Sequence, residues 1–356
     1  MKILSRYINK TIIYVILLIT LILMGIEILL AFIGELSNIG TGNYGMLAAL
    51  RFVLLDMPYQ LSTLFPMAGL VGSLIGLGLL ASQSELIVMQ AAGFSTGQIS
   101  AAVLKAALVI VILATLLGEF VAPYSEDLAT SGRAWAKSNG QALTTKQGMW
   151  LRESNSFIHI SQVLTTHHLL GITSYNFNNE NRLVEALSAD QGNYRNGEWF
   201  LSDVKQTLLT QDKAVSATVP WLRWGVRLDP SLLSIADGDP RNMSILSLYT
   251  YINYLKANGL RATNYELSFW KRIIQPLATV VMIFLAVPFV FGPLRTVPMG
   301  LRIVTGISVG FCFYILNQFF GPVCALYQIP PIIGAALPTA MFILVGFWLL
   351  WRMAKN

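Results

Sequence analysis

Six apolar segments of this 356-residue sequence are long enough to cross a lipid bilayer, and they decide its fold class. A membrane-spanning α-helix needs about 20 predominantly apolar residues. Three such segments precede a polar central region and three follow it. They are Thr11–Ile33, Met57–Leu80, Ile99–Val121, Phe269–Phe291, Arg302–Phe320 and Ile332–Trp351. The sequence therefore predicts an α-helical membrane protein with six spans, three on each side of an inserted domain.

The charged residues are concentrated in the central region. Only 12% of the chain is charged, whereas a soluble domain has about 25%. Of the 42 Lys, Arg, Asp and Glu residues, 23 lie between Ser131 and Ala262. We expect residues 1–130 to hold the first three spans, residues 131–262 to form a polar domain, and residues 263–356 to hold the last three spans.

The polar domain shows the pattern of a β-structure. Short apolar runs alternate with polar turns, and Asn196-Gly197 favours the type I′ turn of a β-hairpin. About ten short strands would fit, which predicts an all-β sandwich or jellyroll. Strands are expected at Phe157–Ile160, Ile172–Phe177 and Val215–Trp224, followed by an amphipathic helix at Ser244–Asn258.

Basic residues next to the spans predict the orientation of the chain. Lys2, Arg6 and Lys10 precede the first span, and such residues stay on the cytoplasmic side. Six crossings then place the central domain outside and both termini inside. The loop that carries Arg295 and Arg302 is expected inside.

Several function classes are disfavoured. The chain has no phosphate-binding Gly-x-x-x-x-Gly-Lys-Ser/Thr motif. His159, His167 and His168 have no ligand-spaced partners, so no metal site is expected. No catalytic triad or paired carboxylates stand out, which argues against an enzyme, and the absence of a Lys/Arg run argues against nucleic-acid binding. Cys312 and Cys324 would lie about 18 Å apart on one helix, too far for a disulfide.

Two acids fall within the spans. Glu27 and Glu119 are each expected near the outer ends of their helices. They are read either as interfacial carboxylates, the favoured interpretation, or as part of a proton or ion relay. The glycines of the second span, including Gly72-x-x-x-Gly76, either permit close helix approach or reflect the frequency of glycine in membrane helices.

A short polar segment follows the second span. Residues 82–95 have a helical composition, with a Ser-x-x-Glu capping box predicted at Ser82–Glu85 and an end at Gly93. About three turns cannot cross a membrane. The segment is therefore expected on the cytoplasmic face, either docked into a groove of a soluble partner or as an ordinary helical loop.

The motifs of the chain resemble one known family over essentially its whole length. The matching stretches are Phe65–Gly78, Ser84–Phe94, Gly292–Gly300 with Thr305–Ile307, and Gln328–Ala335. They are similar to the YjgP/YjgQ permease family, the membrane subunits of the lipopolysaccharide export ABC transporter. Within that family they resemble the LptG type more than its LptF paralogue.

The resemblance implies a fold and a set of partners. The family has six transmembrane helices in the inner membrane and a periplasmic β-jellyroll between the third and fourth. LptG-like and LptF-like chains pair around a cavity for lipopolysaccharide. Two LptB-like ATPase subunits, which bind ATP and magnesium, complete the LptBFG complex, and LptC-like and LptA-like proteins carry the lipid toward the outer membrane. No cofactor is expected on this chain.

The resemblance also implies site residues. The family's coupling helix, which contacts the ATPase, falls on Ser84, Glu85, Val88, Met89, Ala92, Gly93 and Phe94. Glu85 is expected to meet a basic residue of the ATPase groove. Candidates for the cavity lining are Phe32, Phe65, Phe311, Tyr314, Ile315 and Phe319, with ordinary helix packing or lipid contact as the alternative.

One departure from the family is visible. The outer end of the first span can carry lysines that hold the lipid's phosphates, but Phe32–Gly40 contains none. The preferred interpretation is a lipopolysaccharide export permease. An ion-coupled secondary transporter and a non-transporting envelope scaffold are the alternatives.

Overall fold

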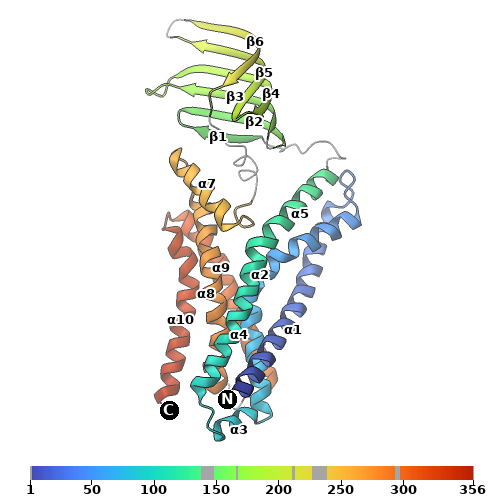
Figure 1. The fold of residues 1–356 in the computed structure, drawn as a ribbon, viewed down its shortest axis with the longest axis vertical. Coiled ribbons are helices and arrows are strands. Elements are labelled where there is room, and N and C mark those ends of the chain that lie inside the picture. The colour runs from blue at the N-terminus through green and yellow to red at the C-terminus, as the bar shows by residue number, and fades with distance from the viewer. Residues whose placement is uncertain are drawn as a thin grey trace. The chain divides into compact units, whose positions relative to one another are not determined.

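In the computed structural model, which describes residues 2–137, 148–165, 167–210, 213–226, 239–292 and 297–355, the six apolar segments are helices (Figure 1). Each is long and apolar enough to cross a membrane. They are α1 (Lys2–Glu35), α2 (Met46–Ser82), α4 (Thr96–Leu116), α8 (Thr263–Phe291), α9 (Met299–Leu326) and α10 (Pro331–Lys355). The prediction of six apolar spans is confirmed, and most of the helices extend beyond the apolar runs at both ends.

The third span contains a π-turn, and the fourth contains two prolines. After α4 the chain passes through a π-helical turn, η2 (Leu117–Val121), directly into α5 (Ala122–Lys137). Helix α8 runs through Pro276 and Pro288 without a break. Each proline ring removes one backbone donor, but the surrounding turns remain helical.

The helices belong to a unit made of residues 1–37, 49–129 and 263–356. Its core includes the first half of α1, where Ile8, Ile12 and Ile16 are completely buried. A Cβ added to Gly72 of α2 would lie 2.6 Å from the Cα of Ile16, and one added to Gly76 would lie 3.4 Å from the Cα of Ile12. The glycine pair therefore lets α1 and α2 approach closely, which favours the first of the two interpretations of these glycines.

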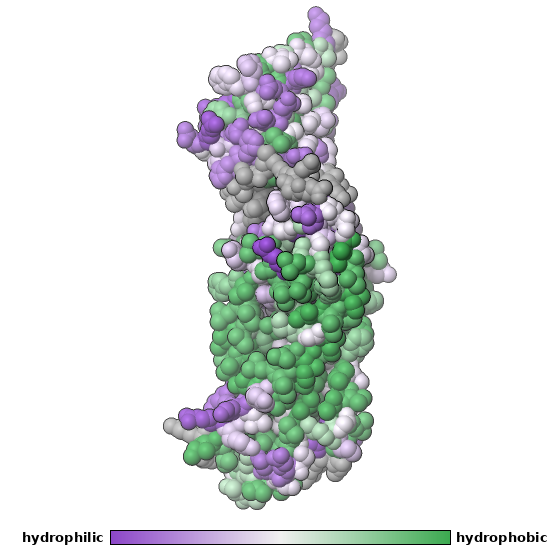
Figure 2. Space-filling model, turned by 90° about the vertical axis from the view of Figure 1, so that its right-hand side faces the viewer, coloured by the Kyte–Doolittle hydropathy of each residue, from purple (hydrophilic) through white to green (hydrophobic). Residues whose placement is uncertain are grey.

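Most of the helical unit's visible surface is apolar. Figure 2 shows a broad hydrophobic band over the helices, and many large apolar side chains of α1, α4, α9 and α10 are exposed. Helices of a water-soluble protein hide such a face against a core. This surface is therefore suited to contact lipid or other apolar helices.

The second unit, residues 38–48 and 130–262, contains one antiparallel sheet. Each strand pairs with the next, so the order is β1-β2-β3-β4-β5-β6. The strands are β1 (Met149–Glu153), β2 (Ser156–Thr165), β3 (His168–Phe177), β4 (Leu183–Arg195), β5 (Glu198–Leu209) and β6 (Ala214–Trp224). The central domain is thus all-β and jellyroll-like. The described residues hold six strands, most of them longer than the short runs that suggested about ten.

One face of this sheet is apolar and buried. Ile158, Ile172 and Leu201 contribute to its core, and Trp199 is 1% exposed. The predicted hairpin turn is confirmed: Asn196 and Gly197 connect β4 to β5, and both have positive φ, 52° and 86°. Two consecutive positive φ values define the type I′ turn, which Asn-Gly adopts most readily.

The predicted amphipathic helix is also present, as α7 (Ile245–Ala257), with Ser244 as its N-cap and Asn258 as its C-cap. The hydroxyl of Tyr254 donates to the carbonyl of Arg152 at 2.9 Å, and the N–H of Ser154 donates to Asn258 Oδ1 at 2.9 Å. These bonds fix the end of α7 to the β1–β2 turn. Burial, with the nearby carboxylate of Glu153, raises the pKa of Tyr254.

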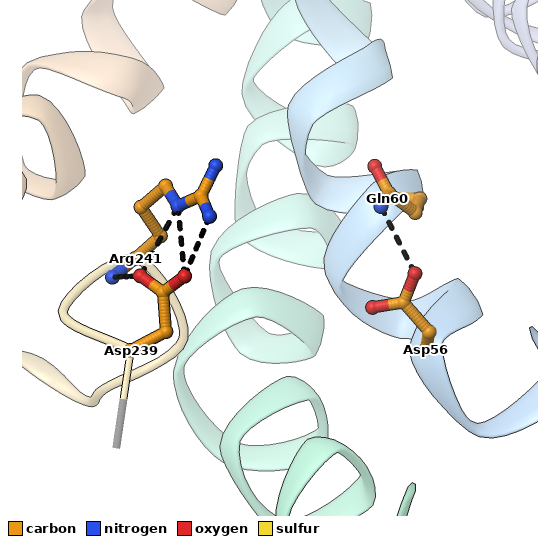
Figure 3. A network of polar contacts seen from close by, with 4 residues as sticks. All are labelled: Asp56, Gln60, Asp239 and Arg241. Atoms are coloured by element: carbon orange, nitrogen blue, oxygen red, sulfur yellow. Dashed lines mark hydrogen bonds and ion pairs between the residues drawn. The ribbon is translucent and has the colours of Figure 1, made fainter. Parts of the chain in front are cut away.

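Two polar pairs stabilise local structure, one in each unit (Figure 3). Arg241 and Asp239 form a bidentate ion pair just before α7. Burial alone would raise the pKa of Asp239, but the hydrogen bonds from Arg241 hold it below its ordinary value. In α2, Gln60 Nε2 donates to Asp56 Oδ2 at 2.9 Å, one turn away.

Candidate functional site

The segment between α2 and α4 forms a seven-residue helix, α3 (Glu85–Ala91). It lies at the same end of the helical unit as the two chain termini (Figure 1). The helix is shorter than the three turns expected from the sequence. It has about two turns, so it connects two spans and does not cross a membrane itself.

The start of α3 differs from the prediction. Ser84 precedes the helix in a left-handed conformation, φ 61°, and no side chain caps the first turn. Ser82 is the last residue of α2, and its hydroxyl donates to the carbonyl of Leu79. The capping box predicted at Ser82–Glu85 is therefore wrong. The described residues do contain one nearby, at Ser95 and Gln98, where it begins α4.

The end of α3 explains why Gly93 is followed by an aromatic residue. The N–H of Gly93 donates to the carbonyl of Gln90, and the N–H of Phe94 donates to that of Met89. These are the two bonds of a Schellman motif, which needs positive φ at Gly93, here 85°. Its hydrophobic contact between the third-last residue and the second residue after the cap fits Met89 and Phe94, both of which are buried.

The burial of Met89 and Phe94 revises their expected role. They belong to the same core cluster as Leu86 and the surrounding spans. They attach α3 to the helical bundle, so their side chains are not available as docking surface. This could not be read from the sequence because a seven-residue helix has little periodicity.

The opposite side of α3 is exposed and apolar. Ile87 is 59% exposed and Val88 is 65% exposed, and Ser84, Ala91 and Ala92 lie on the same side and are exposed. Val88 and Ala92 therefore fit the predicted contact surface. Ile87 is an addition to it, recognisable in retrospect by its position three residues after Ser84, which was in the predicted set.

Glu85 lies at the edge of this surface. It is partly exposed, and one carboxylate oxygen accepts a hydrogen bond from the hydroxyl of Tyr7 in α1 at 3.3 Å. The carboxylate thus connects α3 to α1 while part of it remains open to solvent.

Arg302 is not a loop residue. It lies in the first turn of α9, is 5% exposed, and its Nη1 donates to the carbonyl of Gly78 in α2 at 3.0 Å. The missing side chain of Gly78 leaves room for this contact, since a Cβ there would lie 3.2 Å from Nη1, closer than an ordinary van der Waals contact. Arg302 therefore joins α9 to the end of α2 that leads into α3. Arg295 lies outside the described residues.

The predicted cavity residues separate into two groups. Phe311, Tyr314, Ile315 and Phe319 lie on one face of α9 and are exposed, and Phe32 is partly exposed. Phe65 is 1% exposed and belongs to the bundle core. The α9 residues and Phe32 can face a cavity or lipid. Phe65 instead fits the alternative of ordinary helix packing, because its ring is surrounded by its own chain.

The lysine-free stretch after the first span does receive a basic side chain. Lys137, at the end of α5, donates from Nζ to Asn38 Oδ1 at 2.8 Å and lies 5.4 Å from the ring centre of Tyr44. The approach is close because Gly42 contacts the carbonyl of Lys137. The sequence did not reveal Lys137 as a neighbour of this stretch because it lies 99 positions after Asn38.

The comparisons with known proteins agree with this arrangement. Residues 6–352 match the model of one family, the lipopolysaccharide export system permeases LptF/LptG. The chain belongs to this family. It is 43% identical over 354 residues to the lipopolysaccharide export system permease protein LptG of Escherichia coli K12, and 38% identical over 351 residues to the LptG protein of Haemophilus influenzae. In both cases 98% of each chain is covered.

Membership of the LptF/LptG family gives the fold a role. The six apolar helices and the inserted β-domain are those of a lipopolysaccharide export permease. The resemblance drawn from the sequence motifs is confirmed.

Proposed function

We propose that the chain is the LptG-type membrane subunit of an ABC transporter that extracts lipopolysaccharide from the inner membrane. It pairs with an LptF-like paralogue, and two LptB-like ATPase subunits supply the energy, with ATP and magnesium bound there. The β-domain faces the periplasm and passes the lipid to LptC-like and LptA-like proteins that lead to the outer membrane. Both termini and α3 face the cytoplasm.

The exposed apolar side of α3 carries this proposal. Ile87 and Val88 are large, more than half exposed, and lie at the end of the helical unit where the termini are. A short helix with such a surface is suited to enter a hydrophobic groove of a soluble partner. Glu85 at its edge adds a charge that a basic groove residue can pair with.

Side-chain contacts connect α3 to the membrane-spanning helices, so that a movement of α3 can be transmitted to them. Leu86, Met89 and Phe94 pack it into the core shared with the spans. Glu85 bonds to α1 through Tyr7, and Arg302 bonds α9 to the end of α2. Closure of the ATPase subunits around α3 would therefore displace α1, α2 and α9 together.

The proposed lipid route uses two apolar surfaces, the exposed face of α9 and the interior face of the β-sheet. The exposed face of α9 would border a cavity shared with the paralogue. The buried apolar face of the β-sheet would then shield acyl chains, which is favourable by about 0.8 kcal/mol for each CH₂ removed from water.

The test uses the permease pair co-expressed with its ATPase and purified together. Glu85→Lys and Val88→Asp should each lower the ATPase bound per permease pair, while the melting temperature of the permease pair stays unchanged because both side chains are partly or mostly exposed. Glu180→Lys, a charge reversal at an exposed turn of the β-domain, is the matched control.

Normal ATPase stoichiometry and normal lipid transfer in both α3 variants would contradict the docking role. Mass spectrometry of the same wild-type preparation should find lipopolysaccharide. A complex with its partners but without lipid would favour a scaffold, and transfer driven by a proton gradient without ATP would favour an ion-coupled transporter.

A further inference from the structure

Three helices of the bundle meet at one polar junction. A Cβ added to Gly118 of η2 would lie 3.3 Å from the Cβ of Ser62 in α2 and 3.4 Å from Nη1 of Arg272 in α8. The segments are far apart in the sequence, and the absence of a side chain at Gly118 leaves room for this close approach.

The carbonyl of Ser62 cannot accept the regular backbone hydrogen bond of its own helix. In a regular α-helix it would accept the N–H of the residue four positions later, but that residue is Pro66, which has none. The side chain of Gln275, on α8, donates from Nε2 to this carbonyl at 2.5 Å. A side chain of a neighbouring helix thus replaces the missing backbone donor.

The carbonyl of Gly118 has a similar deficit with a different cause. The N–H of Ala122, four residues later, donates to Leu117 in the π-turn, and the residue five positions later is Pro123. Arg272 Nη1 donates to the Gly118 carbonyl at 2.8 Å. The opposite charge of Glu119 also acts on this guanidinium, so the acid predicted at the outer end of the third span has a charge partner.

Arg272 and Gln275 are three residues apart and therefore share one face of α8. In an apolar bundle, a backbone carbonyl without a donor is costly because water is absent. The two side chains together make the irregular turns of α2 and of α4–α5 tolerable. Prolines and π-turns are also the places where helices bend.

We propose that Arg272 and Gln275 are positioning residues. Their side chains replace the missing backbone donors to the carbonyls of Ser62 and Gly118, and these two sites form a hinge that bends during lipid transport. A bond to a side chain can be released and remade when a helix bends, whereas a regular backbone bond would hold the helix straight. This inference rests on the proposed transport function.

The first arm of the test measures whether the side chains act as donors. In the purified complex with paralogue and ATPase, Gln275→Leu and Arg272→Met should each lower the melting temperature, by about 2–4 °C. Adding Pro66→Ala should restore Gln275→Leu, because residue 66 then donates its N–H to Ser62. Adding Pro123→Ala should restore Arg272→Met by returning a donor five residues after Gly118.

Lys271→Met is the matched control. Lys271 donates from Nζ to the carbonyl of Asn317 at 2.8 Å, but the residue four positions after Asn317 is Gly321, which has an N–H. Adding Pro322→Ala should therefore not restore Lys271→Met. Absence of rescue in both test pairs, or equal rescue in the control pair, would overturn the donor assignment.

The second arm measures transport. The two rescued double variants have regular backbone hydrogen bonds at these sites. They should hydrolyse ATP normally but transfer at least fivefold less lipopolysaccharide for each ATP. Normal transfer in the rescued pairs would overturn the hinge. Absence of ATP-dependent transfer in the wild-type complex would contradict the proposed function itself, and the melting temperatures would still decide the donor assignment.

Discussion

Helices α2 and α1 are both long and apolar, but they differ in how much of them the chain itself covers. Of the 18 residues in the apolar stretch of α2, 72% are buried, compared with 11% in the corresponding stretch of α1 and 22% in that of α9. The glycines of α2 admit the backbone of α1 and the side chains of α8 and α9. The difference teaches that small residues decide which apolar helix becomes the core and which faces are left for lipid or a partner chain.

The largest effect should separate two phenylalanines. Phe65 of α2 is 1% exposed and Phe311 of α9 is 55% exposed. Phe65→Ala should destabilise the purified permease pair by about 3–5 kcal/mol because it leaves a cavity, whereas Phe311→Ala should cost far less. Thermal unfolding of the two variants in the same detergent measures this. Equal losses would mean that α9 is packed as tightly as α2.

The second effect should separate two glycines. A Cβ at Gly72 would meet the backbone of Ile16, but one at Gly25 of α1 has nothing within 4 Å. Gly72→Leu is therefore expected to cost about 3 kcal/mol through overpacking, and Gly25→Leu to leave the melting temperature nearly unchanged. If Gly72→Leu were also tolerated, the close crossing of α1 and α2 would be wrong.

The sequence predicted the helices of this comparison better than their environments. Hydropathy located all six spans because length and composition suffice for that. It could not tell Phe65 from Phe311, since both lie in apolar segments and only the packing of the folded chain buries one of them. Arg302 was expected in a loop because charge usually ends a span, yet Gly78 provides a buried acceptor for it.

The candidate site was predicted in part for the same reason. The position of α3 and the exposure of Val88 followed from motif and composition. The burial of Met89 and Phe94 depends on a Schellman turn and a core contributed by other helices. The capping box predicted at Ser82–Glu85 does not form because α2 continues to Ser82, and a separate capping box at Ser95 and Gln98 begins α4.

A smaller effect should come from the contact between α9 and the end of α2. Arg302→Met removes a buried guanidinium and its bond to Gly78, with an expected cost of about 2 kcal/mol. Arg352→Met is the control: this exposed side chain lies over the ring of Trp348 and contributes about 0.5–1 kcal/mol. Urea or thermal unfolding compares the two. A harmless Arg302→Met would argue against the contact.

The smallest effect should come from the polar contact between α1 and α3. Tyr7→Phe removes a 3.3 Å hydrogen bond between partly exposed groups, which is worth at most about 0.5 kcal/mol in stability. ATPase binding to the permease should be unchanged or tighter, because the Glu85 carboxylate becomes free to pair with the partner. Weaker binding in a titration of labelled ATPase would show that Tyr7 orients Glu85.

The central claim is that ATP hydrolysis by a docked partner drives lipopolysaccharide through this chain. It is tested most directly with a photocrosslinking residue at Ile172, on the buried apolar face of the β-sheet, and a control at Thr173 on the opposite face. In vesicles with the assembled complex, lipopolysaccharide adducts should appear at residue 172 only when ATP is supplied, and should be lost with Glu85→Lys. Adducts that form equally without ATP, or none at Ile158, Ile172 and Leu187 alike, would contradict the account.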